Sequence, residues 1–187
     1  LSRTFALLER LGNPQERLKF VHITGTNGKG STAAMVSSVL TRAGLRTGLY
    51  TSPHLWRFHE RFQVDGVPIS DELLGELGEM VIKAGEGMED PPTEFELMTA
   101  LGMEFFLRAG CDIVVLEVGL GGRLDSTNVI PAPEAAVITN IGLEHTQELG
   151  NTRALIAREK SGIIKRGCAA VLYHQSREVE EVGGEGW

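Results

Sequence analysis

Residues 22–32 read HITGTNGKGST, and this stretch decides which fold the chain adopts. It follows the apolar run 18–23 and precedes AAMVSSVLTRAG, whose apolar residues lie mostly along one helical face. A glycine-rich turn between a strand and a helix is where a phosphate-binding loop is expected. The spacing differs from the usual G-x-x-x-x-G-K-[ST] pattern, because Ile23 occupies the first glycine position and Gly30 separates Lys29 from the hydroxyl residues.

The loop nevertheless contains the groups that bind nucleotide phosphates. Gly28 and Gly30 let backbone N–H groups approach phosphate oxygens, and the Lys29 ammonium and a helix N-terminus lie behind them. A glycine-rich turn without a ligand is the alternative. We predict that the loop binds the phosphates of a nucleotide through Gly25, Thr26, Asn27, Gly28, Lys29, Gly30, Ser31 and Thr32.

The composition is that of an ordinary globular protein and excludes several functions. The 187 residues are enough for one core, with 42% hydrophobic and 23% charged residues. A formal net charge of -7 argues against nucleic acid as a partner. No apolar run approaches the ~20 residues that span a membrane, and the charged start LSRTFALLERLG is unlike a signal peptide. Cys111 and Cys168 lack metal-ligand spacing, so we expect core or near-core thiols in a reducing, cytoplasmic setting.

Strand-like and helix-like runs alternate along the chain. Strands are predicted over residues 18–23, 46–50, 111–119, 135–139 and 168–173, and helices over 31–43, 71–84, 93–109 and 152–162. Ser70 caps one helix, and Thr93 forms a capping box with Glu96 at the next. Residues 51–68 form a long connection in which Asp65-Gly66 is a hairpin signal. The alternation predicts an α/β fold of the P-loop NTPase type, with a mostly parallel sheet flanked by helices.

Side chains suited to chemistry follow the ends of several predicted strands. Ligands of such sheets bind beyond the carboxyl ends of the strands, so we predict that Lys29, Ser52, Glu117 and His145 converge there. Glu117 directly follows the apolar residues 113–116 of a central strand, where a carboxylate is costly unless a cation meets it. Oxygen ligands suit magnesium, to which His145 would bind through water. The alternatives are that Ser52 caps a turn and that His145 is a hydrogen-bonded loop histidine.

Ordered blocks of sequence resemble the folylpolyglutamate synthase and dihydrofolate synthase family of the Mur-ligase superfamily. They are GTNGKGS (25–31), TSPHLWRFHER (51–61), TEFELMTALG (93–102), LEVGLGGRLDSTN (116–128), TNIGLEH (139–145) and REKSGIIKRG (158–167). The resemblance covers roughly residues 17–170. It implies a fold of the Mur-ligase central-domain type and an ADP-forming ligase. Such an enzyme joins L-glutamate to the carboxylate of dihydropteroate or folate through an acyl phosphate.

The resemblance also assigns roles to residues. It implies that Lys29 meets the phosphates of ATP, and that Ser52, Glu117 and His145 match the magnesium sphere. Lys160 matches a lysine that is carbamylated in many members of the family and then reaches a second magnesium ion. Lys29, Glu117, His145 and Lys160 are therefore the expected catalytic residues, with ATP and Mg²⁺ at two sites as cofactors.

The segment 53–61 resembles the pterin-side binding segment of the family. The resemblance thus implies that Pro53, His54, Arg57 and Arg61 contact the pteroate or folate substrate. TSPHL and Gly30 favour this branch over a Mur-type ligase that acts on a cell-wall precursor, which is the second enzymatic hypothesis.

The sequence departs from the family pattern toward its C-terminal end. It contains no Asp-Gly-Ala-His-Asn block and no second Rossmann-like half, which in the family belong to a C-terminal domain. We expect residues 1–174 to form a partial ATP-binding domain and the glutamate-ligase domain to be absent. Residues 175–187 are expected to be an acidic tail, in which the glutamates over 178–181 form a solvated face or a disordered end. Truncation would expose apolar surface and favour self-association. A nucleotide-binding module without catalysis is the third hypothesis.

Overall fold

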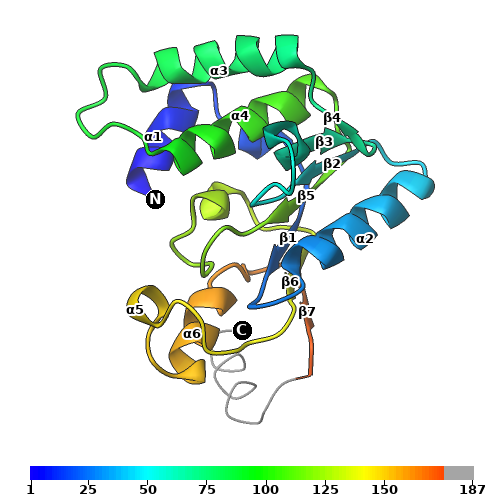
Figure 1. Cartoon of the computed structure of the whole chain (residues 1–187), viewed down its shortest axis with the longest axis vertical. Helices are drawn as coiled ribbons and strands as arrows, with labels where there is room; N and C mark the ends of the chain where they lie inside the picture. Colours follow the sequence, from blue (N-terminus) through cyan, green and yellow to red (C-terminus); the bar gives the residue numbers. More distant parts are fainter. Residues whose placement is uncertain (175–187) are drawn as a thin grey trace.

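A computed structural model describes residues 1–174, which form one seven-stranded sheet with helices on both faces (Figure 1). The strands are β1 (Phe20–Thr24), β2 (Thr47–Tyr50), β3 (Phe62–Val64), β4 (Val67–Pro68), β5 (Ile113–Glu117), β6 (Ala135–Ile138) and β7 (Ala169–Leu172). Their order is β4-β3-β2-β5-β1-β6-β7. The pairs β2–β3 and β3–β4 are antiparallel, and the other four pairs are parallel. The predicted α/β fold is confirmed. The glutamates over 178–181 lie outside the described residues.

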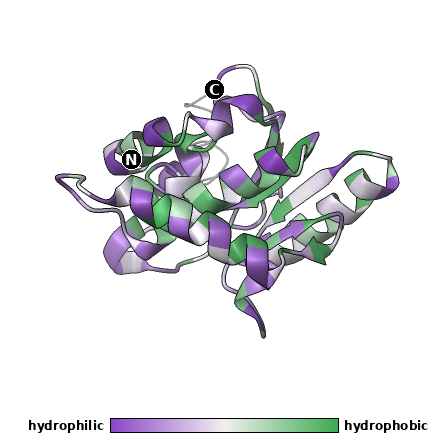
Figure 2. Cartoon of the chain, turned by 90° about the horizontal axis from the view of Figure 1, so that it is seen from above, coloured by the Kyte–Doolittle hydropathy of each residue, from purple (hydrophilic) through white to green (hydrophobic). Residues whose placement is uncertain are grey.

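The helices cover the sheet in two layers. They are α1 (Ser2–Arg10), α2 (Lys29–Arg42), α3 (Asp71–Gly85), α4 (Glu94–Arg108), α5 (Thr146–Leu149) and α6 (Arg153–Ser161), with 3-10 turns η1 (Pro14–Arg17), η2 (Phe58–Arg61) and η3 (Ser126–Val129). In Figure 1, α2 lies apart from the group formed by α1, α3 and α4. Purple and green residues alternate along the helices in Figure 2, the pattern of amphipathic helices that cover a core.

The central strands are buried on both sides, as the apolar run 113–116 predicts. Every residue of β1 and β5 is buried. Val21 and Ile23 pack in the cluster under α2, whereas Phe20 packs in the larger cluster that includes the residues of α4. Because neighbouring parallel strands are in register, their carboxyl ends form one continuous edge at which the loops after β1, β2 and β5 meet.

The predicted helix caps are confirmed. The Ser70 hydroxyl accepts a hydrogen bond from the Leu73 N–H at 3.2 Å at the start of α3. At the start of α4 the Thr93 N–H donates to Glu96 at 2.7 Å, and the Glu96 N–H donates back to the Thr93 hydroxyl at 3.3 Å. These local bonds satisfy backbone groups that a helix end leaves unpaired, so they fix where each helix begins.

Two parts of the prediction need correction. The segment 51–68 is not a plain connection, because it contains η2, β3 and β4, and the predicted Asp65-Gly66 turn joins the two strands with φ of 52° and 80°. The N-terminal α1 and η1 lie before the first predicted strand. These elements are short, so an apolar pattern has few residues in which to show its period. None of the helices formed by residues 1–174 has both the length and the apolar content that crossing a membrane demands.

Candidate nucleotide and substrate site

The loop between β1 and α2 takes a backbone conformation that glycine adopts most easily. Gly25 has a φ of 149° and Gly28 a φ of 80°. A side chain on Gly25 would collide with Thr139. Lys29, the first residue of α2, folds back over the loop, and its ammonium donates to the carbonyls of Gly25 at 2.8 Å and Thr26 at 3.3 Å. The predicted loop is therefore preformed, with its cation held above it.

The segment after β6 holds the loop in place. The Thr26 N–H donates to the Asn140 carbonyl at 2.7 Å, and the Asn27 N–H donates to the Asn140 side-chain oxygen at 2.7 Å. In return, the Thr139 hydroxyl donates to the Asn27 carbonyl at 2.7 Å. No sequence pattern points to Asn140 for this role, because its partners lie far away in the chain.

Glu117 lies beside the phosphate loop at the end of β5. Its side chain is 4% exposed and accepts a hydrogen bond from the Ser52 N–H at 3.0 Å. Burial raises the pKa of Glu117, and the Ser52 N–H and the charge of Lys29 only partly oppose this effect. A β-carbon on Gly30 would lie 3.5 Å from both carboxylate oxygens, so this glycine keeps the space beside them open. Lys29, Ser52 and Glu117 are thus brought together at one sheet edge.

Lys160 reaches the same loop from α6. Its side chain is 1% exposed, and its ammonium donates to the Glu144 carboxylate at 2.7 Å and to the Gly25 carbonyl at 3.0 Å. Burial lowers the pKa of Lys160 although Glu144 opposes the shift. Burial alone would raise the pKa of Glu144, but the ion pair with Lys160 outweighs it and the pKa is lowered. Glu144 is a site residue that the sequence pattern does not indicate.

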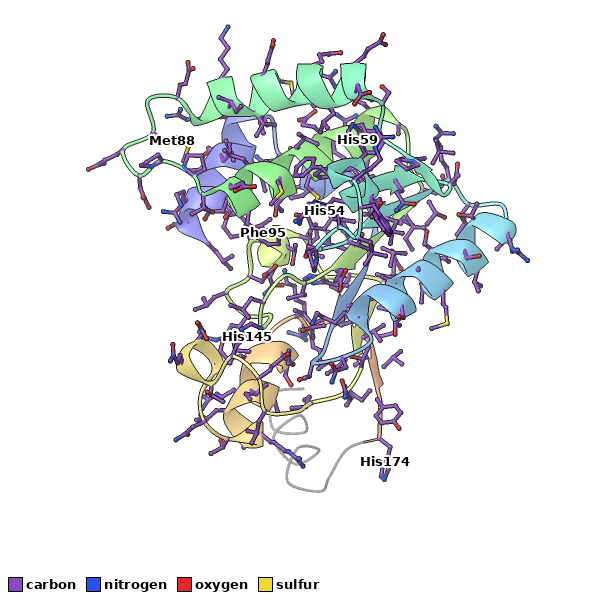
Figure 3. The ribbon with its side chains drawn as sticks, in the orientation of Figure 1. His54, His59, Met88, Phe95, His145 and His174 are labelled. Carbon is purple, nitrogen blue, oxygen red and sulfur yellow. The ribbon has the colours of Figure 1, made fainter. Side chains whose placement is uncertain are left out.

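His145 is placed differently from the other predicted site residues. Its side chain is exposed, its backbone has a φ of 43°, and it occupies the N-cap position of α5 without a capping hydrogen bond from its side chain. Figure 3 shows it beside α5. Within residues 1–174 no group of three or more histidine, cysteine, aspartate or glutamate side chains is gathered closely enough to hold a metal ion. The buried carboxylate of Glu117 and the hydroxyl of the neighbouring, half-buried Ser52 are oxygen ligands of the kind that magnesium binds while it keeps most of its waters, and a contact from His145 stays a prediction.

A cavity of about 470 Å³ opens next to Ser52. Its lining consists of Ser52, Pro53, Arg61, Thr93, Glu94, Phe95, Met98, Gly119, Leu120 and Asp125. A second cavity of about 330 Å³ shares Thr93, Phe95, Leu120 and Asp125 with the first. Volumes of this size are those of small-molecule sites.

The residues predicted to contact the substrate lie at two different cavities of the structure. Pro53 and Arg61 line the cavity next to Ser52. His54 accepts a hydrogen bond from Arg61 at 3.0 Å and stands near the middle of the molecule in Figure 3. Arg57 lines a separate cavity of about 420 Å³, beside His59 and the start of α3. Pro53 and Arg61 thus border the cavity next to Ser52, His54 contacts Arg61, and Arg57 borders a different cavity, while substrate contact by all four residues stays a prediction.

The walls of the cavity include residues that the sequence pattern does not single out. Phe95 projects from the start of α4, and Figure 3 shows it between the upper helices and α5. Asp125 is 8% exposed and accepts the Leu120 N–H at 2.8 Å. A β-carbon on Gly119 would collide with Phe95, so only glycine lets the aromatic ring approach this loop.

Comparison with known proteins agrees with this geometry. Residues 23–179 match the Mur ligase middle domain. The chain is 46% identical to a folylpolyglutamate synthase of Lacticaseibacillus casei over 174 residues, which are 90% of this chain and 40% of that protein. It is also 46% identical to the dihydrofolate synthase/folylpolyglutamate synthase of Bacillus subtilis over 176 residues, 91% of this chain and 41% of that protein.

Solved structures show the same likeness. An FPGS-AMPPCP-folate complex superposes with a TM-score of 0.95 at 42% identity, over 98% of this chain and 46% of the other. The chain thus spans less than half the length of the relatives it matches. Sequence, fold and the loop beside Glu117 agree, and we conclude that this chain belongs to the Mur ligase family, as a middle-domain stretch similar to folylpolyglutamate and dihydrofolate synthases.

Proposed function

We propose that the chain is the nucleotide-binding part of an ADP-forming ligase that joins L-glutamate to dihydropteroate or folate. One observation carries the proposal most directly. The phosphate loop with Lys29, the carboxylate of Glu117 and a cavity of about 470 Å³ meet around Ser52. A nucleotide phosphate and the carboxylate of a substrate would therefore lie next to each other. The likeness to relatives with these names supports the same reaction.

The residues divide the work of phosphate transfer between them. Lys29 exchanges the loop carbonyls for oxygens of ATP and neutralises charge that develops on the transferred phosphate. Glu117 and Ser52 are the residues that would hold magnesium, and His145 would contact it through water. Magnesium, when bound, supplies further positive charge against the phosphate oxygens. The substrate carboxylate attacks the γ-phosphate, and the amine of glutamate then displaces phosphate from the acyl phosphate.

We assign the cavity to the pteroate or folate substrate. Phe95 offers an aromatic face for a flat heterocycle, and Asp125 offers an acceptor for N–H groups. Arg61, with His54 behind it, offers a charged donor for carbonyl or carboxylate oxygens. These contacts suit a molecule that carries both an aminated ring system and a carboxylate.

Lys160 is the candidate for a second cation site. Its amine is buried among polar groups and bonded to Glu144 at 2.7 Å. Carbamylation would replace the ammonium with a carboxylate and so supply an oxygen ligand for a second magnesium. We further propose that residues 1–174 act as the ATP-binding domain and that the protein works in the cytoplasm, which suits the free thiols of Cys111 and Cys168.

The test measures the binding of ATP and folate, and glutamate-dependent ADP release with dihydropteroate or tetrahydrofolate as acceptor. It is run on this chain and on a full-length relative, both purified from a host that lacks its own ligase. ATP binding to the chain, with glutamate-dependent turnover by the relative on either acceptor, supports the proposal. ATP binding without folate binding favours a nucleotide-binding module. Turnover with a cell-wall precursor alone favours a Mur-type ligase.

A further inference from the structure

A line of buried polar side chains runs from the middle of the sheet to the wall of the cavity. His22 lies in β1, Thr127 lies in η3, and both are 0% exposed. The His22 Nε2 atom is 2.9 Å from the Thr127 hydroxyl. The Thr127 hydroxyl in turn donates to Oδ1 of Asp125, which lines both cavities. We name His22 and Thr127 the relay.

The direction of each hydrogen bond in the relay follows from the number of available protons. Asp125 Oδ1 also accepts the Thr127 N–H at 3.0 Å, so this oxygen acts as an acceptor. The hydroxyl of Thr127 donates its single hydrogen to Asp125, so it must accept the hydrogen bond that joins it to His22. Burial, with a smaller effect from Lys165, lowers the pKa of His22 to about 3. The ring is therefore neutral, its proton lies on Nε2, and Nδ1 makes no hydrogen bond within the described structure.

A histidine at position 22 is costly for stability, and its hydrogen bond to Thr127 accounts for its presence there. A buried ring nitrogen without a partner is unfavourable, and an apolar side chain would be more stable at a position enclosed by the core. The second carboxylate oxygen, Oδ2, accepts the Leu120 N–H at 2.8 Å. Because donors bind both oxygens, rotation of the Asp125 carboxylate would break hydrogen bonds, so these bonds favour one orientation of its plane beside the two cavities that it borders.

We propose that His22 and Thr127 are positioning residues, which hold Asp125 in one plane as an acceptor for the N–H groups of a substrate heterocycle. This inference rests on the proposed function, because it takes the cavity to be the folate site. Held in this way, Asp125 would accept an amino or ring N–H group of the heterocycle that the proposed function assigns to the cavity. A substrate without that amino group would lose the contact and the discrimination that depends on it.

The test compares two ligands rather than one. The affinity of the chain for pteroic acid is measured by quenching of the ligand's pterin fluorescence. The same measurement uses an analogue with hydrogen in place of the 2-amino group. We expect the unchanged chain to prefer pteroic acid about tenfold or more. Thr127→Val removes the hydroxyl at nearly constant volume and is expected to reduce this preference to about one- to threefold, whereas Thr127→Ser retains it.

Further variants separate positioning from general stability. His22→Met breaks the relay at its other end, while His22→Gln keeps an N–H donor there and is expected to keep the preference. Thr47→Val is the matched control, because Thr47 is also 0% exposed but donates its hydroxyl to Leu45 at the opposite end of the sheet. It is expected to lower the melting temperature without changing the preference. Affinity for the ATP analogue AMPPCP checks that every variant retains its fold.

The possible results distinguish the inference from the proposed function. A preference that is unchanged in both Thr127→Val and His22→Met would overturn the relay, while pteroic acid binding by the unchanged chain would leave the proposed function standing. Absence of pteroic acid binding by the unchanged chain, despite AMPPCP binding, would overturn both. Loss of preference in Thr127→Val with recovery in Thr127→Ser would support the relay.

Discussion

Lys29 carries the cation of the phosphate loop, and its removal gives the most direct prediction at the scale of a residue. Lys29→Ala is expected to weaken ATP binding about ten- to hundredfold, because it deletes a charge-assisted contact worth roughly 1.5–3 kcal/mol. Lys19→Ala is the control, because Lys19 lies before β1, at the end away from the phosphate loop. Its side chain is 70% exposed, and its ammonium lies 3.8 Å from the Glu134 carboxylate. Calorimetric titration with Mg-ATP measures both, and equal affinities would refute the loop assignment.

Glu117 predicts a dependence on pH whose sign follows from its burial. Burial raises its pKa in the folded state, so protons bind the folded chain more readily than the unfolded one. The metal-free chain therefore loses stability as pH rises from the unfolded pKa, near 4.5, through the raised folded value. Glu117→Gln is expected to melt higher than the unchanged chain at pH 7 without magnesium, and equally at pH below 4.5.

Magnesium is expected to reverse that order at Glu117. The ion raises the melting temperature of the unchanged chain because it binds only the folded state, whereas Glu117→Gln is expected to respond little. Thermal melts with and without magnesium, at several pH values, measure both effects. A Glu117→Gln variant that gains as much from magnesium as the unchanged chain would show that this carboxylate is not a ligand.

At the scale of an element, the start of α2 depends on the left-handed conformation of Gly28. Gly28 and Gly44 have φ of 80° and 91°, and a β-carbon on either would meet no other atom within 4 Å. Alanine at each position is expected to cost about 1–2 kcal/mol of stability through backbone strain alone. Only Gly28→Ala is expected to weaken ATP binding as well, because it alone lies in the phosphate loop. Urea denaturation and calorimetry measure the pair, and equal ATP affinities would contradict this role.

The elements that the sequence predicts well are those defined by local interactions. The helices that begin after Ser70 and Thr93 start where their caps predict, since the capping bonds join residues three positions apart. The buried strand β5 is evident from its run of apolar residues. The strands β3 and β4, with 3 and 2 residues, are not evident, because β3 is set by its pairing with β2 and β4 by its pairing with β3 rather than by their own pattern.

The same distinction holds for the site, where strand ends predict some residues and contacts between distant segments determine others. Strand ends predict that Lys29, Ser52 and Glu117 meet, because parallel strands place their carboxyl ends together. Asn140 and Glu144 are not predicted, since their roles come from hydrogen bonds to the phosphate loop and to α6. No pattern within one segment of sequence encodes a bond whose partner lies in another segment.

At the scale of the whole molecule, β7 is an edge strand of the sheet that residues 1–174 form. All four residues of β7 are exposed, and Val171 and Leu172 are 52% and 43% exposed. Such an edge pairs readily with another chain, so we expect these 187 residues alone to self-associate at high concentration. Analytical ultracentrifugation over a concentration series measures this. Val171→Lys is the test variant, and the exposed Val39→Lys on α2 is its control.

The isolated chain is expected to bind ATP but to ligate glutamate at a negligible rate. It spans 40% of the length of the relative from Lacticaseibacillus casei. Positioning of a second reactant supplies roughly 7–11 kcal/mol of a barrier, so a site that does not hold the amine loses nearly all synthetic rate. Slow ATP hydrolysis is the expected residual reaction. An ADP assay with product chromatography checks this, and glutamylated product at the rate of a full-length relative would contradict it.

The carbonyl of Gly25 accepts hydrogen bonds from both Lys29 and Lys160, which belong to different helices. A phosphate that binds must therefore replace the Gly25 carbonyl as the hydrogen-bond acceptor of Lys29. Binding becomes an exchange of acceptors, so the heat released is the small difference between two sets of contacts. Most of the affinity then comes from charge neutralisation and from water leaving the phosphate and the loop. ATP affinity of this kind weakens as ionic strength rises and changes little with temperature.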